Sequence, residues 1–212
     1  MTHPHWRSLI AAHAMLSIAA MAASAQPRTL PPYITGLGTV TPYTVAVEPR
    51  VSGQLMTVNF KEGDVVQAGQ LLATIDPQAT GNPALSSYTQ ITAPITGVTG
   101  LRLIDPGNLV HAGPNPSRIV VITQTQPIAV LFTVPEEYVR QIWTRLKQPG
   151  TCPVEALNRE GSRTIATGRL VAIDNQIDST LGMIKVKAMF DNKDGALFPG
   201  QFVTAKLFLG SR

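Results

Sequence analysis

The stretch Val51–Gln70, VSGQLMTVNFKEGDVVQAGQ, returns in outline 44 residues later as Ile95–Pro114, ITGVTGLRLIDPGNLVHAGP. Both copies keep three glycines spaced by ten and six residues, and apolar residues align at the same offset. The aligned pairs are Gly53 with Gly97, Gly63 with Gly107, Gly69 with Gly113, Val51 with Ile95, Val65 with Leu109 and Val66 with Val110. Self-similarity at a fixed offset indicates a duplicated structural unit.

Each copy of this repeat has the pattern of short strands separated by turns. Val51–Phe60 alternates loosely between apolar and polar residues, as a half-buried strand does. Lys61–Asp64 and Asp105–Asn108 are turn clusters, and apolar runs follow at Leu71–Ile75 and Arg118–Ile122. Neither copy has enough apolar residues for its own core. We therefore expect the two to pack face to face as a pseudo-symmetric β-sandwich of about 75 residues.

Composition narrows the class of protein further. With 44% hydrophobic and 14% charged residues, the 212-residue chain is too apolar for intrinsic disorder. It lacks the several runs of about 20 apolar residues that a polytopic membrane protein needs. One cysteine allows no intramolecular disulfide. The 17 Lys and Arg residues form no run or stripe, so we expect no nucleic-acid partner.

The N-terminal residues 1–25 have the order of a secretory signal peptide. Arg7 precedes the Ala-rich apolar stretch Ser8–Ala22, and Ala23–Ala25 is a small-x-small cleavage pattern. The alternative is a single N-terminal anchor helix. We expect export, with cleavage after Ala25.

The sequence pattern changes after the repeat, from Gln126 onward. Ile128–Val134 is an apolar strand, and Pro135 is placed to open a helix whose apolar face is Val139, Ile142, Trp143 and Leu146. This pattern places Trp143 in the core. Further strands are expected at Cys152–Leu157, Ile165–Ile173, Gly182–Phe190 and Gln201–Leu209, with Asp174–Thr180 as one of the turns. Five strands and one helix predict a small antiparallel β-barrel, so the fold class is mostly β.

Motifs in a fixed order then connect the chain to a known family. They are Thr35–Val40 (TGLGTV), Val51–Leu55 (VSGQL), Val58–Gly63 (VNFKEG), Leu72–Pro77 (LATIDP), Ile91–Gly97 (ITAPITG), Gly100–Asn108 (GLRLIDPGN), Leu131–Glu136 (LFTVPE), Asp174–Asp178 (DNQID) and Phe198–Val203 (FPGQFV). In this order the chain resembles the periplasmic adaptors, or membrane fusion proteins, of resistance-nodulation-division (RND) multidrug efflux pumps of Gram-negative bacteria. The resemblance implies a non-catalytic subunit, periplasmic and associated with the inner membrane. Such a subunit couples an inner-membrane transporter to an outer-membrane channel.

Within this family the repeat is similar to the biotinyl/lipoyl-type domain, and here the chain departs from the pattern. Asp76–Gln90, which joins the two halves, contains no lysine to carry lipoamide or biotin. Family members insert a long helical hairpin at this bridge, whereas Gln78–Ser87 offers ten residues, too few for two long helices. The expected layout is a signal at 1–25, an N-terminal strand region at 26–47, the lipoyl-like domain at 48–125 with a short bridge at 77–90, and the barrel at 126–210.

The same resemblance implies a shortened adaptor. Tyr33–Val47 would supply the first part of the family's membrane-proximal domain, whose C-terminal part we do not find before Arg212, so these strands would show unpaired edges. We expect contact with an RND transporter and association with itself or with full-length adaptors. The hairpin tip that meets the outer-membrane channel is missing.

No residue pattern predicts a catalytic, cofactor-binding or metal site. Cys152 reads as a buried structural thiol, and His111, expected in a solvated turn, belongs to the other domain. Asp174 and Asp178 could bind a cation, but a polar turn between strands is the interpretation that we favour. The competing hypothesis for function is a soluble periplasmic module that binds a small molecule or a metal.

Overall fold

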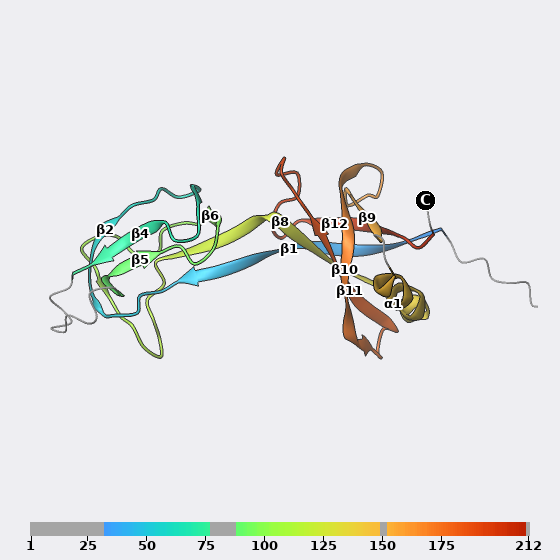
Figure 1. Cartoon of the computed structure of the whole chain (residues 1–212), viewed down its shortest axis with the longest axis horizontal. Helices are drawn as coiled ribbons and strands as arrows, with labels where there is room; N and C mark the ends of the chain where they lie inside the picture. Colours follow the sequence, from blue (N-terminus) through green and yellow to red (C-terminus); the bar gives the residue numbers. More distant parts are fainter. Residues whose placement is uncertain (1–31, 77–87, 149–151, 211–212) are drawn as a thin grey trace, which may run out of the picture. The chain divides into compact units, whose positions relative to one another are not determined.

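The computed structural model of the chain describes residues 32–76, 88–148 and 152–210. Its elements, shown in Figure 1, are β1 (Tyr33–Val47), β2 (Gly53–Val58), β3 (Val65–Val66), β4 (Leu71–Ile75), β5 (Gln90–Thr92), β6 (Gly97–Thr99), β7 (Leu109–Val110), β8 (Val120–Pro135), the 3₁₀ turn η3 (Glu136–Tyr138), α1 (Val139–Lys147), β9 (Pro153–Leu157), β10 (Thr164–Asp178), β11 (Met183–Phe190) and β12 (Phe202–Phe208). No helix in this part of the chain is long and apolar enough to cross a membrane. The expected signal peptide and most of the bridge lie outside the described residues.

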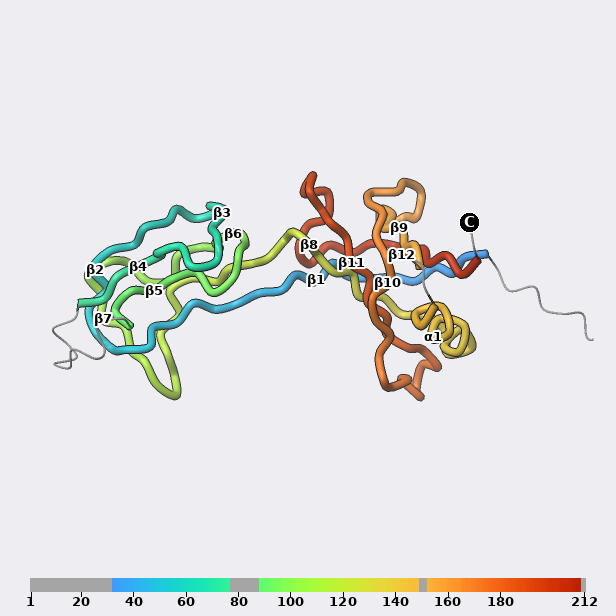
Figure 2. Tube along the Cα trace, in the orientation of Figure 1, coloured from blue at the N-terminus to red at the C-terminus, as the bar shows by residue number. Residues whose placement is uncertain are grey.

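The two copies of the repeat exchange strands with each other. β2 pairs with β7 through Gly53 opposite Val110, and β6 pairs with β3 through Gly97 opposite Val66. The two pairs are equivalent under the 44-residue offset of the repeat, because Gly53 corresponds to Gly97 and Val110 corresponds to Val66. The predicted pseudo-symmetric sandwich is therefore confirmed, and Figure 2 shows the two halves lying side by side.

The turns of the two halves follow the same symmetry. The backbone N–H of Gly63 donates to the carbonyl of Thr99 at 3.0 Å, and that of Gly107 donates to the carbonyl of Leu55 at 2.7 Å. Both glycines have positive φ, 83° and 92°, a conformation that glycine adopts without steric cost. Turn chemistry is thus the reason for this pair of repeated glycines, whereas Gly53 and Gly97 lie in strands.

The sandwich core is built jointly by both halves. Leu55, Leu72 and Ile75 from the first half and Val110, Ile119 and Ile122 from the second are at most 2% exposed and belong to one cluster. The symmetry fails on the surface. Thr57 and Asn59 are exposed polar residues in the first half, whereas their counterparts Leu101 and Leu103 are apolar and 73% and 54% exposed.

The barrel has six strands rather than the five predicted. A closed antiparallel ring runs β1–β12–β9–β10–β11–β8 and returns to β1. The additional strand is β1, whose residues 33–39 pair with β12 and whose residues 38–47 pair with β8. The expectation of unpaired edges at Tyr33–Val47 was therefore wrong: these residues close the ring.

Two glycines of the TGLGTV motif permit this closure. A Cβ on Gly38 would lie 2.9 Å from the Leu131 carbonyl oxygen and 2.9 Å from the Phe132 Cβ. A Cβ on Gly36 would collide with the carbonyl oxygen of Thr133. Only residues without a side chain let β1 approach β8 this closely.

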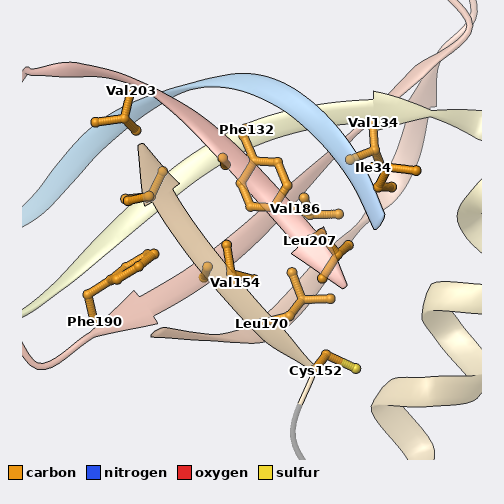
Figure 3. Packing of buried hydrophobic residues seen from close by; sticks show 14 of the residues in the cluster. Ile34, Phe132, Val134, Cys152, Val154, Leu170, Val186, Phe190, Val203 and Leu207 are labelled. Carbon is orange, nitrogen blue, oxygen red and sulfur yellow. The ribbon is translucent and has the colours of Figure 1, made fainter. Parts of the chain in front are cut away.

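The barrel interior is filled by alternate residues of its strands. Figure 3 shows Phe132, Val154, Val186 and Leu207, from four different strands, directed into one interior, and each is at most 2% exposed. Along β8, residues 130, 132 and 134 are buried while Leu131 is exposed, as a strand with one buried face requires.

A buried asparagine holds the loop between β11 and β12. Asn192 is 5% exposed and has φ of 51°. Its side-chain amide donates to the carbonyls of Thr125 and Leu197 and accepts the N–H of Leu197, at 2.9–3.0 Å.

Three local predictions were wrong in detail. Pro135 ends β8, and a 3₁₀ turn precedes α1, which starts at Val139. Trp143 is 50% exposed, with the Lys147 ammonium 4.8 Å from its ring, so only Ile142 on the helix is buried. Asp174 lies within β10 rather than in a turn, because β10 and β11 continue as a hairpin to Asp178.

Candidate interaction surfaces

Cys152 and His111, which the sequence analysis considered for catalysis, lie in different domains of the structure. Cys152 lies in the barrel core, where burial raises the pKa of its thiol and the positive charge of Arg145 partly opposes that rise. His111 follows β7 in the sandwich, and its backbone N–H donates to Ser117 Oγ at 3.0 Å. Within the described residues, no imidazole therefore lies beside the thiol.

The paired carboxylates stabilise local backbone. Asp178 Oδ1 accepts the N–H groups of Thr180 and Leu181 at 3.0 and 3.3 Å, and Asp174 Oδ1 accepts the N–H of Asn175 at 2.8 Å. Within residues 32–76, 88–148 and 152–210, no group of three or more acidic, His or Cys side chains is arranged to hold a metal ion.

The outer face of the barrel carries a groove with apolar walls. It has a volume of about 310 Å³ and is lined by Leu37 of β1, Leu131 of β8 and Phe202 of β12, among others. These side chains are 59%, 38% and 54% exposed. Strand register explains their proximity, because Thr39 lies opposite Phe202 on one side and opposite Leu131 on the other.

Cationic side chains lie beside this groove. Lys187 is opposite Leu131, and the Arg159 guanidinium lies 5.7 Å from the centre of the Phe202 ring. We call Leu37, Leu131, Phe202, Lys187 and Arg159 the basic patch. Sequence reasoning missed it, although an apolar residue in the outward register of Ile128–Val134 was the signal that could have shown it.

A second concavity on the barrel, of about 430 Å³, lies at the β10–β11 hairpin. Its lining includes Asp174, Ile177, Asp178, Leu181 and Met183, which we call the acidic patch. Leu181 is 70% exposed. Thr133 and Lys185 line both this concavity and the groove of the basic patch, so the two patches are neighbours.

A further hollow lies on the sandwich. It measures about 550 Å³ and lies between β1 residues 45–47 and β5 residues 90–92. The Arg50 guanidinium stacks 5.8 Å from the Tyr88 ring at its rim. Its lining mixes apolar residues such as Val45 and Ile91 with polar residues such as Glu48 and Gln90.

The join between the two halves is short. Thr74 of β4 lies opposite Gln90 of β5, so the strands on either side of the bridge are direct neighbours. The sequence between them contains no lysine, and so no amine for a carrier group.

Two family models match consecutive parts of the chain. Residues 43–123 match the barrel-sandwich hybrid domain of RND MFPs, that is, RND membrane fusion proteins. Residues 127–211 match the beta-barrel domain of the same proteins.

Curated relatives carry the name multidrug resistance protein MdtA. The protein from Cronobacter turicensis is 37% identical over 256 positions, covering 90% of this chain and 61% of the relative. That from Escherichia coli O157:H7 is 38% identical over 253 positions, covering 89% and 61%. The chain thus spans about three fifths of the length of these relatives.

Solved structures share the fold. A MacA–MexA chimeric protein containing the Pseudomonas aeruginosa MexA alpha-hairpin domain has a TM-score of 0.64 at 15% identity, covering 85% of this chain and 82% of the chimera. MacA from Actinobacillus actinomycetemcomitans has a TM-score of 0.62 at 14% identity, covering 84% and 79%. A duplicated sandwich followed by a six-stranded barrel, each matched by its own family model, shows that the chain belongs to the RND membrane fusion proteins.

Proposed function

We propose that this protein is a periplasmic adaptor subunit of a tripartite multidrug efflux complex, in a shortened form. The observation that carries the proposal is the pair of RND membrane fusion protein domains in unbroken order, with 37–38% identity to MdtA proteins over about 90% of the chain. The role is structural: the protein holds a transporter and its neighbours together and performs no chemistry.

The proposed partner at the inner membrane is an RND transporter, and the proposed location is the periplasmic face of that membrane. Residues 1–25 would direct export. The barrel supports a role in contact, since its outer face exposes apolar side chains beside charges, as interaction surfaces do. Association with itself or with full-length adaptors would place this subunit within the complex.

Contact with the outer-membrane channel is the function that we propose is lacking. The match to the Cronobacter protein spans 256 positions, whereas 90% of this chain is about 190 residues, so about 65 positions of the relative have no counterpart here. The direct pairing of β4 with β5 across a short bridge supports placing this difference at the family's hairpin. A second protein would then have to reach the channel.

The first experiment tests contact with a transporter. The chain, tagged at its C-terminus, is expressed in a bacterium that carries an RND transporter but lacks its own MdtA. It is crosslinked in the living cell and then purified through the tag. The transporter should be recovered with this chain but not with an unrelated exported protein carrying the same tag. Recovery of the chain alone would refute the adaptor proposal.

A second experiment separates the missing hairpin from the rest of the adaptor. The hairpin of an MdtA relative is inserted between Asp76 and Tyr88, and a Gly/Ser insert of equal length is the control. We expect drug resistance to rise only with the hairpin, since it would supply the channel contact. Resistance with the unmodified chain would refute the proposed loss of channel contact.

A further inference from the structure

The groove of the basic patch has the dimensions of a site for one alkyl chain. One row of residues, opposite one another across four strands, runs along it: Lys187 of β11, Leu131 of β8, Thr39 of β1 and Phe202 of β12. Neighbouring strands are about 4.8 Å apart, so the row spans roughly 14 Å. Exposed Leu37 also lines the groove, from β1. An extended chain about as long as that of dodecanoate can therefore lie across the strands, against apolar side chains.

The apolar and the cationic side chains share the outer face of the barrel. Exposed residues alternate with buried ones along β8 and β11, so Leu131 is on the same face as Lys185 and Lys187. Phe202, at the start of β12, is exposed on this face as well. The groove thus has apolar walls, with two ammonium groups at its β11 end.

Lys185 and Lys187 are available for an anionic group. The three ion pairs within the described ranges join other residues. Lys185 also lines the neighbouring hollow, together with Asp174 and Asp178. Lys187 does not, so we expect an anionic group to lie beside Lys187. At the opposite end of the groove, the Arg159 guanidinium already stacks on an aromatic ring.

We propose that this groove binds a free anionic amphiphile with a single alkyl chain, of the class of fatty-acid carboxylates. Its volume of about 310 Å³ is at the lower end of the roughly 300–1,000 Å³ of ligand sites, and apolar walls with a few charged groups are typical of such sites. The small volume favours one chain over a two-chain phospholipid. Nine of the described residues line the groove, fewer than the roughly 20–30 per side of a stable protein interface.

Binding is measured by isothermal titration calorimetry of the full chain with dodecanoate, below its critical micelle concentration. Octanoate should bind about tenfold more weakly or worse, because it buries fewer methylene groups. Dodecyltrimethylammonium has the same alkyl chain but a positive head group, which meets like charge at the lysines, so it should bind more weakly still. Higher ionic strength should weaken the binding of dodecanoate, since both lysines are exposed.

Matched variants locate the ligand in the groove. Lys187→Glu acts on the head group and Leu131→Thr on the alkyl chain, and each should weaken dodecanoate binding by about fivefold or more. The controls are Lys193→Glu, at an exposed lysine in the loop after β11, and Leu181→Thr, at an exposed leucine of the neighbouring hollow. Both controls should bind dodecanoate as the unchanged chain does. Circular dichroism shows whether each variant is folded.

Several results would overturn the proposal. They are the absence of saturable dodecanoate binding, equal binding of the cationic amphiphile, and groove variants that bind no more weakly than the controls. Sedimentation of the chain with phosphatidylglycerol vesicles, lost in Lys187→Glu, would also overturn it, because the ligand would then be a membrane surface. No transporter is present in these measurements, so none of their outcomes bears on the adaptor proposal.

Discussion

Replacing Gly38 by alanine should destabilise the barrel, although it adds only one methyl group. Gly38 lies where the ring closes, paired with Val203 of β12 on one side and with Phe132 of β8 on the other. The new Cβ would lie 2.9 Å from the Leu131 carbonyl oxygen, 2.9 Å from the Phe132 Cβ and 3.1 Å from Val130 Cγ1. Two of the three neighbours are backbone or directly attached to it, so they cannot rotate away.

The size of the effect follows from these contacts. Carbon atoms pack favourably at about 3.5–4.0 Å, so β1 and β8 would have to separate by more than about half an ångström. Overpacking of this kind costs about 1–3 kcal/mol, and we expect the upper end because the strand pairing itself is disturbed. For a domain of this size, about 3 kcal/mol corresponds to a fall in Tm of roughly 6–12 °C.

The assay is thermal unfolding by calorimetry and far-ultraviolet circular dichroism. Gly210→Ala is the control, since a Cβ there meets nothing within 4 Å and the glycine has no positive φ. It should leave the Tm unchanged. If Gly38→Ala unfolds within about 2 °C of the unchanged protein, β1 does not close the ring as described.

Three further changes probe other parts of the structure. Burial raises the pKa of the Cys152 thiol, so the unfolded chain loses the thiol proton at a lower pH than the folded chain does. The free energy of unfolding should therefore be constant below the ordinary thiol pKa of about 8.5 and should fall as the pH rises above it. Between pH 8 and 10, the urea midpoint of unfolding should therefore fall less in Cys152→Ala than in the unchanged protein. An equal fall in both proteins would contradict a buried thiol at this position. Asn192→Ala removes three hydrogen bonds and leaves alanine at positive φ, so the free energy of unfolding should drop by about 3 kcal/mol, whereas Asn192→Gly should recover part of it. The double variant Leu101→Thr/Leu103→Asn copies the residues of the first half, so it should keep its Tm within about 2 °C and bind less of a hydrophobic dye; a large fall in Tm would show that these exposed leucines stabilise the sandwich.

Local signals in the sequence predicted the sandwich well. Gly63 and Gly107 mark turns, and the turn conformation depends on a few neighbouring residues, so these two glycines could be aligned without coordinates. The barrel strands after Gln126 were also found, because buried and exposed residues alternate along them. The prediction that Trp143 lies in the core was wrong, because helical periodicity identifies one apolar face but does not show how much of that face packs against the barrel.

Patterns along the sequence were enough to show that one unit with regularly spaced glycines occurs twice and that a set of strands with one helix follows. These features depend on the spacing of residues that are close together in the sequence. Two features became visible only in the folded chain. β1 completes the barrel, about 90 residues before its partners in β8, and Leu37, Leu131 and Phe202 meet on one face. Such neighbours are set by strand register across the ring, and register is fixed only when all six strands pair.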